Sequence, residues 1–210
     1  SGGENRIVIF PGANEKITPD KIEKFMDRYE HNIEIMLIQN EIPQESIKKA
    51  IEQARKSGKT IVYDPAPKEN TAVEYLTGID FLTPNETEFE YLYTLCGGTE
   101  KTSIEKKALW FKKHVQVKNL ILKQGSKGSL FVGEDGKIIF TPAFKVDSID
   151  STAAGDIFNA AFAVKYGLSK NIEESLVYAS AASAISVTRK GAQSSIPTDQ
   201  EVIELIRSHT

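Results

Sequence analysis

The sequence predicts an α/β fold in three layers, with helices on both faces of a mostly parallel β-sheet. Short apolar runs typical of strands alternate with segments of helical periodicity along most of the 210 residues. Strands separated by helices of this length pair in parallel through crossover connections, which place the helices on the faces of the sheet. One antiparallel pair is also expected, because two short apolar runs flank the turn Glu134-Asp135-Gly136.

Each expected element has its own boundary signals. Runs rich in β-branched and aromatic residues predict strands at 7–10, 33–38, 60–63, 80–83, 120–122, 129–132 and 137–140. Helices are expected to start at Thr18-Pro19-Asp20 and at Pro43, because proline suits the first turn of a helix. Further helices are expected near 85–95, 103–114, 154–167, 171–188 and 198–207. Because the chain opens with a polar stretch and a very short strand, we expect it to begin inside a larger protein.

The composition excludes several classes of protein. Hydrophobic residues make up 40% of the chain and charged residues 26%, which is typical of a globular domain. The net charge is -3 and no run of Lys and Arg is dense, which argues against a nucleic-acid partner. No apolar run reaches the length of a membrane span. The single cysteine, Cys96, cannot form a disulfide within the chain, which fits a reducing, cytoplasmic location.

One segment carries residue types suited to phosphate chemistry. Ala153-Ala154-Gly155-Asp156 comes at the start of an expected apolar helix. The first N–H groups of a helix have no partner within the helix, and small side chains let an anion approach them closely. A carboxylate in the same turn, Asp156, can accept the proton of an attacking hydroxyl. The structural alternative is an ordinary helix start, where an acidic residue is favourable in any case.

The segment from Asp150 to Asp156 closely resembles the catalytic signature of the ribokinase-type, or pfkB, sugar kinases, whose usual form has glycine where Ala153 stands. The resemblance extends over nearly the whole chain. It implies a ribokinase-like fold in which residues 1–210 are the C-terminal nucleotide-binding and catalytic portion, with the N-terminal strands and most of a β-lid absent and residues 1–10 a remnant of that lid. The implied reaction transfers the γ-phosphate of ATP to a primary sugar hydroxyl, with D-ribose giving D-ribose 5-phosphate.

The resemblance also implies roles for individual residues. Asp156 is the implied catalytic base, beside an anion hole formed by the backbone of Ala153, Ala154 and Gly155. In Asn85-Glu86-Thr87-Glu88, Asn85 is implied to contact phosphate and Glu88 to hold Mg²⁺ through water, which is reasonable because Mg²⁺ keeps several waters. The implied loop along the nucleotide consists of Lys123, Gln124, Gly125, Ser126, Lys127 and Gly128. Taken alone, the Asn85 motif is better explained as a capped helix start, and the loop equally well as a hairpin turn.

A monovalent cation is implied beside the anion hole. The segment from Ser186 to Ser195 matches the family's C-terminal loop, which surrounds such an ion. The implied ion is K⁺, and its implied ligands are Asp150, Thr152, Ser186, Arg189, Gly191 and Ser195. A cation at this place would offset the phosphate charge and fix the geometry of the anion hole. The alternative is a helix that ends at glycine, followed by a polar connector.

The sugar side carries fewer matches. Glu41, in Gln39-Asn40-Glu41, matches the family segment whose acid hydrogen-bonds the sugar, and the resemblance implies that Asp156 contacts the same substrate. The expected partners are ATP and a small sugar, with no nucleic acid and no membrane, and either a homodimer or association with the missing N-terminal portion. The alternatives are a kinase for fructose or a nucleoside, and a nucleotide-binding fragment without turnover. A nicotinamide-binding domain is disfavoured, because no Gly-x-Gly-x-x-Gly follows a strand.

Overall fold

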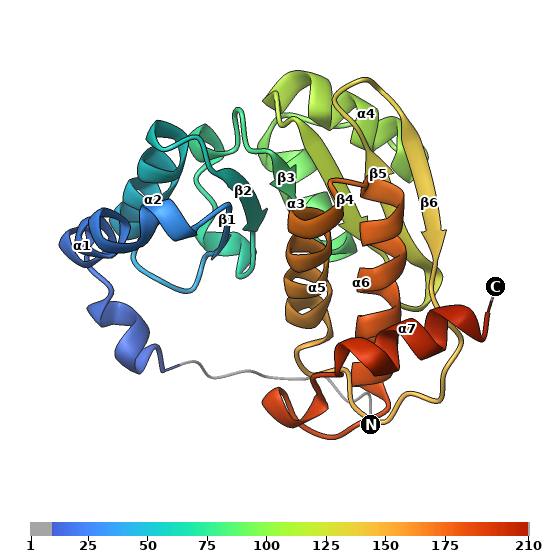
Figure 1. Cartoon of the computed structure of the whole chain (residues 1–210). Coiled ribbons are helices and arrows are strands. Elements are labelled where there is room, and N and C mark those ends of the chain that lie inside the picture. Colours follow the sequence, from blue (N-terminus) through green and yellow to red (C-terminus); the bar gives the residue numbers. More distant parts are fainter. Residues whose placement is uncertain (1–9, 210) are drawn as a thin grey trace.

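The computed structural model describes residues 10–209, which form three layers with the sheet in the middle (Figure 1). Its strands follow one another across the sheet in the order of the sequence. They are β1 (Ile35–Gln39), β2 (Thr60–Asp64), β3 (Phe81–Leu82), β4 (Asn119–Lys123), β5 (Gly128–Val132) and β6 (Ile138–Pro142). β1 to β4 are parallel, whereas β4, β5 and β6 pair antiparallel. The predicted mostly parallel sheet and the antiparallel β5–β6 hairpin are confirmed, whereas the antiparallel pairing of β4 with β5 was not predicted.

The α-helices of the described chain are α1 (Pro19–Tyr29), α2 (Gln44–Lys56), α3 (Glu86–Leu95), α4 (Ile104–Val115), α5 (Ala154–Ser169), α6 (Ile172–Val187) and α7 (Asp199–Arg207). Short 3-10 helices lie at Gly12–Lys16, Glu30–Asn32, Lys68–Asn70, Val73–Tyr75, Gly125–Lys127 and Gln193–Ser195. α2, α3 and α4 cover one face of the sheet, and α5 and α6 cover the other (Figure 1). α1 lies beside α2, and α7 beside α6.

The strand side chains divide between two cores because successive residues of a strand point to opposite faces. On β2, Ile61 and Tyr63 pack with α2, α3 and α4, whereas Val62 between them packs with α5 and α6. β4 repeats the pattern, with Leu120 and Leu122 on the first face and Ile121 on the second. Burial on both faces explains why these strands read as continuous apolar runs in the sequence.

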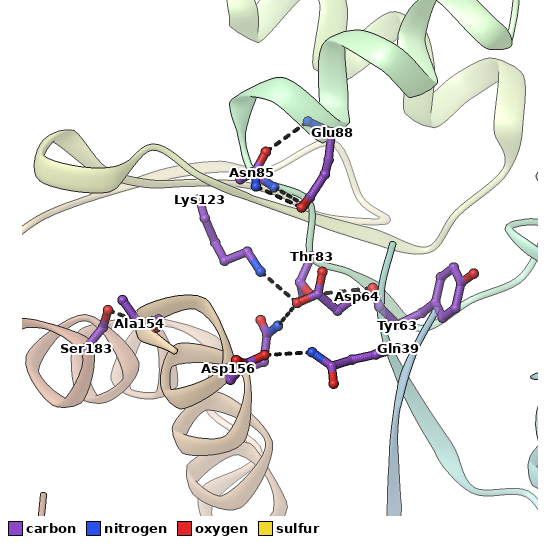
Figure 2. A network of polar contacts seen from close by, with 11 residues as sticks. Gln39, Tyr63, Asp64, Thr83, Asn85, Glu88, Lys123, Ala154, Asp156 and Ser183 are labelled. Carbon is purple, nitrogen blue, oxygen red and sulfur yellow. Dashed lines mark hydrogen bonds and ion pairs between the residues drawn. The ribbon is translucent and has the colours of Figure 1, made fainter. Parts of the chain in front are cut away.

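The second core fixes the position of α5. Phe162 of α5 is fully buried, and its ring lies 5.0 Å from that of Phe81 on β3 in an edge-to-face arrangement. Tyr166, one turn further along α5, also meets Phe81 edge to face, at 4.8 Å. These contacts set α5 across the parallel strands, so that its N-terminus lies near their carboxyl ends (Figure 2).

Several expected elements differ from those in the structure, and others lie outside residues 10–209. The strand expected at 80–83 is reduced to Phe81–Leu82, because Thr83-Pro84 already turns toward α3 and proline has no N–H to donate to a sheet. The strand expected at 7–10 and the lid remnant at 1–10 lie outside the described residues except for Phe10, which is in no strand. No helix within residues 10–209 is long and apolar enough to span a membrane.

Candidate active site

Polar side chains from the carboxyl ends of the parallel strands meet the N-terminus of α5 (Figure 2). Gln39 ends β1, Asp64 ends β2 and Lys123 ends β4, while Asn85 follows β3 and bridges to Lys123. The carboxyl ends of parallel strands gather at one edge of a sheet, and this edge is where open α/β sheets bind ligands.

A pocket of about 640 Å³ opens at this edge. Its polar lining includes Asp64, Asn85, Glu88, Lys123, Gly155 and Asp156. Its apolar lining includes Ala66, Ala143, Phe144, Val146, Phe158, Ala184 and Val187. The volume lies within the range that is usual for small-molecule sites, and the lining offers both polar and apolar groups to a ligand.

The start of α5 has the features of an anion-binding site. Ala153, Ala154, Gly155 and Asp156 all line the pocket. No side chain caps this helix, nor α1, α2 and α4, whereas α3, α6 and α7 are each capped by the side chain before their first residue. The Ala154 N–H donates to the Ser151 carbonyl oxygen at 3.2 Å, so the N–H groups of Gly155 and Asp156 are the ones left for a ligand. The Ser183 hydroxyl of α6 donates a hydrogen bond to the Ala154 carbonyl oxygen at 3.0 Å and ties the two helices together here.

Ala153 adopts the left-handed backbone conformation, with φ 61° and ψ 10°. The sharp turn at this residue directs the chain from Thr152 into the helix axis, so that the following N–H groups line the pocket. Glycine adopts this conformation without the steric cost of a Cβ atom, which accounts for the glycine that the resembling signature carries at this position.

Asp156 is exposed to solvent and bonded to the end of β1. The Gln39 side-chain amide donates a hydrogen bond from Nε2 to Asp156 Oδ1 at 2.6 Å (Figure 2). The bond joins residues that are 117 positions apart in the sequence. Asp156 therefore has one carboxylate oxygen oriented by the protein, and the other is available to a substrate hydroxyl.

An ion pair lies deeper in the pocket. Lys123 Nζ lies 2.9 Å from Asp64 Oδ2, with the two side chains only 13% and 3% exposed. The same Asp64 oxygen accepts a hydrogen bond from the side-chain amide of Asn159, on α5. Asp64 Oδ1 and Asn159 Oδ1 are buried without a hydrogen-bond partner. Of these three side chains, only Lys123 was assigned a role from the sequence, as part of the predicted nucleotide loop.

Asn85 and Glu88 form a reciprocal cap on α3. Asn85 Oδ1 accepts from the Glu88 N–H, and Glu88 Oε2 accepts from the Asn85 N–H, both at 2.8 Å. A third bond runs from Asn85 Nδ2 to Glu88 Oε1. Burial raises the pKa of Glu88, an effect that the Asn85 N–H opposes. Both residues line the pocket, so the capped helix start and the ligand-facing position occur together.

The predicted nucleotide loop is only partly in the pocket. Gly125, Ser126, Gly128 and Lys123 line it, but Gln124 and Lys127 are not among the lining residues. Lys127 pairs instead with the exposed Glu86 at 3.0 Å. Gly128 has φ 116°, and a Cβ atom there would lie 2.0 Å from the Thr141 carbonyl oxygen, so the β5–β6 pairing requires glycine.

The residues of the predicted cation site lie beside the pocket, around Asp150. The N–H and hydroxyl of Thr152 donate to Asp150 Oδ1 at 2.9 and 2.6 Å, and the Gly191 N–H donates to Oδ2 at 2.9 Å. These bonds, with that of the Thr152 hydroxyl first, lower the pKa of Asp150 to about 2. Asp150 thus links the segment that precedes α5 to the 186–195 segment. In that segment Ser186 and Ser195 are fully buried, and Arg189 forms an ion pair with Glu201.

Glu41, the expected sugar-binding acid, is exposed and is not among the residues that line the pocket. It follows β1 by two residues, and Gln39, at the end of that strand, is the residue that reaches Asp156. Within residues 10–209, no group of three or more His, Cys, Asp or Glu side chains is arranged to hold a metal ion.

Residues Asp64, Gln39 and Asn159 were missed from the sequence. Asp64 directly follows the strand expected at 60–63. Its signal was its place at the carboxyl end of a strand parallel to those that precede Asn85 and end at Lys123, because such ends meet at one edge. Gln39, at the carboxyl end of β1, carried the same signal, whereas Asn159 carried none, since its contact depends on how α5 crosses the sheet.

An uncapped helix N-terminus that opens on a pocket at the carboxyl edge of a parallel sheet is a general arrangement of α/β proteins that bind phosphorylated ligands. The family model for pfkB family carbohydrate kinases matches residues 1–199. Ribokinase from Haemophilus influenzae is 36% identical over 203 residues, which are 97% of this chain and 65% of that protein.

Solved structures agree with this match. The crystal structure of ribokinase from Thermotoga maritima has 42% identity and a TM-score of 0.84, and the match covers 98% of this chain and 66% of that one. Ribokinase from Arabidopsis thaliana, solved with ribose and ATP, has 32% identity and a TM-score of 0.83 over 98% of this chain and 66% of that one. The chain belongs to the pfkB family of carbohydrate kinases, and it spans 65% of the length of the curated Haemophilus influenzae relative.

Proposed function

We propose that this chain is the nucleotide-binding and catalytic part of an ATP-dependent sugar kinase that transfers the γ-phosphate of ATP to a primary hydroxyl of D-ribose. The observation that supports this most directly is the uncapped start of α5, where Asp156 and the small residues 153–155 line one pocket with Lys123. Phosphoryl transfer requires a positioned base and fixed donors for the charge on the phosphoryl oxygens, and this segment carries both. The ribose and ATP in the Arabidopsis thaliana relative support the choice of substrates.

Asp156 acts as the base in this proposal. Gln39 holds one of its oxygens at 2.6 Å, and the other accepts the proton of the sugar hydroxyl as that oxygen attacks the γ-phosphorus. The N–H groups at the start of α5 then donate to the phosphoryl oxygens. The adenine and ribose of ATP lie against the apolar lining residues Ala143, Phe144, Val146, Ala184 and Val187.

Two acidic residues of the lining, Asp64 and Glu88, fit a divalent cation that accompanies the nucleotide. Asp64 Oδ1 is a buried carboxylate oxygen without a partner, and Glu88 lines the same pocket. Carboxylate oxygens, directly or through water, are the ligands that Mg²⁺ prefers. When bound, Mg²⁺ would offset the charge of the phosphates, with Glu88 holding it through water and Asn85 placed beside a phosphate.

The proposed base is tested by Asp156→Asn in an assay of ribose-dependent ADP release. The variant should lower kcat by about 10²–10⁴-fold while the Kd for ATP changes little, because the amide keeps the shape of the side chain but cannot accept the proton. Fructose and adenosine as acceptors test the alternative substrates. ATP binding without ADP release for any acceptor would favour a nucleotide-binding role instead, and near-normal kcat in the variant would refute the assignment of Asp156.

The proposal includes K⁺ as an activating ion, held by Asp150, Thr152 and the carbonyl groups of the 186–195 segment. The bonds that draw Thr152 and Gly191 to Asp150 support it, since Asp150 supplies the one formal negative charge among the proposed ligands. At constant ionic strength, K⁺ should raise the rate more than Na⁺ or Li⁺, and Asp150→Ala should weaken the difference. Equal rates in the three salts would contradict the cation site.

A further inference from the structure

The buried Asp64–Lys123 ion pair is unlike the other ion pairs of the described chain. Both of its side chains are nearly buried, whereas each other pair within residues 10–209 has at least one well-exposed partner. Burying two charges is costly, and a buried pair often contributes less to stability than apolar side chains of the same size would. Stability therefore does not explain why this ion pair lies in the pocket.

The hydrogen bonding of the pair is incomplete. Lys123 and Asn159 both donate to Asp64 Oδ2, and Asp64 Oδ1 and Asn159 Oδ1 have no partner. Asn159 thus fixes the Asp64 carboxylate from α5, and the carboxylate holds the Lys123 ammonium from β2. An ammonium has three N–H donors, so Lys123 can keep this bond and still donate to a ligand.

The held ammonium lies next to the anion hole. A Cβ atom built on Gly155 would lie 3.5 Å from Lys123 Nζ, so the ammonium flanks the first turn of α5. An anion bound to the N–H groups of that turn would be within reach of Lys123. The other lysine that lines the pocket, Lys145, is exposed, so Lys123, with a side chain 13% exposed, is the less accessible of the two.

We propose that Lys123 donates to the terminal phosphates of the nucleotide, those beyond the α-phosphate, and that Asp64, fixed by Asn159, is the positioning residue that aims it. This inference rests on the proposed function, since it requires a nucleoside triphosphate in the pocket. If Asp64 acted through its charge alone, its removal should strengthen anion binding, because a carboxylate near a phosphate site repels the phosphate. A positioning role predicts the opposite, weaker binding. A weaker preference for ATP in Asp64→Asn therefore indicates that Asp64 positions Lys123. A stronger preference indicates that Asp64 only neutralises the charge of Lys123.

The experiment is calorimetric titration of the 210-residue chain with ATP and with AMP, in EDTA so that no divalent cation contributes. Lys123→Met should reduce the preference for ATP over AMP by about 10- to 100-fold, the range for a hydrogen bond between charged groups. Asp64→Asn should reduce the same preference, although it leaves the Lys123 charge in place. The AMP affinity should change little in either variant.

The Lys118–Asp80 ion pair supplies a matched control. Lys118 precedes β4 at its opposite end, lies 2.7 Å from Asp80 and does not line the pocket. Lys118→Met and Asp80→Asn should leave the ATP preference unchanged. If Lys123→Met fails to fold because Asp64 is left unpaired, the double variant Lys123→Met/Asp64→Asn removes both charges. It should lose the preference to the same extent as Lys123→Met, because Asp64 acts through Lys123.

The outcomes are distinct. A wild-type chain without any preference for ATP over AMP would overturn the proposed nucleotide site and this inference with it. A wild-type preference that survives in Lys123→Met, or in the double variant, would overturn the role of Lys123 alone. A stronger preference in Asp64→Asn would overturn the positioning role of Asp64, and so would an Asp64 effect that appears only when Mg²⁺ replaces EDTA.

Discussion

Phe162→Ala tests whether the packing of α5 on the sheet controls the stability of the chain. The Phe162 ring is fully buried, meets Phe81 edge to face at 5.0 Å and stacks on Tyr166 at 5.7 Å. The residues around it, including Val62, Ile121 and Leu176, come from β2, β4 and α6, so no single flexible segment can collapse into the space that the ring leaves.

Truncation of a fully buried phenylalanine costs about 3–5 kcal/mol, which combines the lost transfer free energy with the cavity that remains. For a chain of this size, each kcal/mol corresponds to roughly 2–4 °C in Tm. The expected fall in Tm is therefore about 6–20 °C. Urea unfolding followed by circular dichroism gives the free energy of unfolding directly, and the slope with urea should stay unchanged if only the native packing is lost.

Leu168→Ala is the control on the same helix. Its side chain is 82% exposed, two residues beyond Tyr166, and truncation at such a position changes the free energy of unfolding by no more than about 0.5 kcal/mol. A loss below about 1 kcal/mol for Phe162→Ala, or equal losses for the two variants, would show that α5 does not pack on the sheet as described.

Two further predictions concern the turns that flank the pocket. Gly128→Ala should destabilise the chain by about 2–5 kcal/mol in urea unfolding, because the added Cβ meets the Thr141 carbonyl oxygen at 2.0 Å and φ is 116°. The control Gly136→Ala, at φ 82° with no atom within 4 Å, should cost only about 1–2 kcal/mol. Similar losses of stability in the two variants would contradict the close approach of Gly128 to Thr141. The pKa of Asp150 falls from 3.8 to about 2 on folding, so its contribution to stability should be present above about pH 4 and be lost as the pH falls toward 2. The stability difference between wild type and Asp150→Asn should therefore shrink between pH 6 and pH 2.5, and a difference independent of pH would refute the contacts with Thr152 and Gly191.

The layers and the start of α5 were predictable from the sequence because they depend on local signals. Apolar runs on β2 and β4 reflect burial on both faces, and the small residues before Asp156 mark a helix start that no side chain caps. The ends of elements were less predictable. β3 keeps two residues because Pro84 follows so closely, and α5 runs on to Ser169 beyond the expected 167.

The contacts within the candidate site were not predictable in the same way. Gln39 and Asp156 are 117 residues apart, and Asp64 and Asn159 are 95 apart, so each contact depends on the angle at which α5 crosses the strands. Glu41 stays the predicted sugar-binding acid, whereas Gln39, two residues earlier in the same segment, is the side chain that reaches Asp156. That contact follows from where β1 ends, which a motif match does not show.

The strand order of the sheet also bears on synthesis of the chain. Because the strands pair in sequence order, each one can join its neighbour soon after it leaves the ribosome. The face that carries Phe81 is covered only when Phe162 arrives, roughly 80 residues later, or about 4–16 s at ordinary elongation rates. Until then half of the sheet's apolar surface is open to other nascent chains. The helix that brings Asp156 to the pocket is thus also the one that ends the period in which the growing polypeptide is most prone to aggregate.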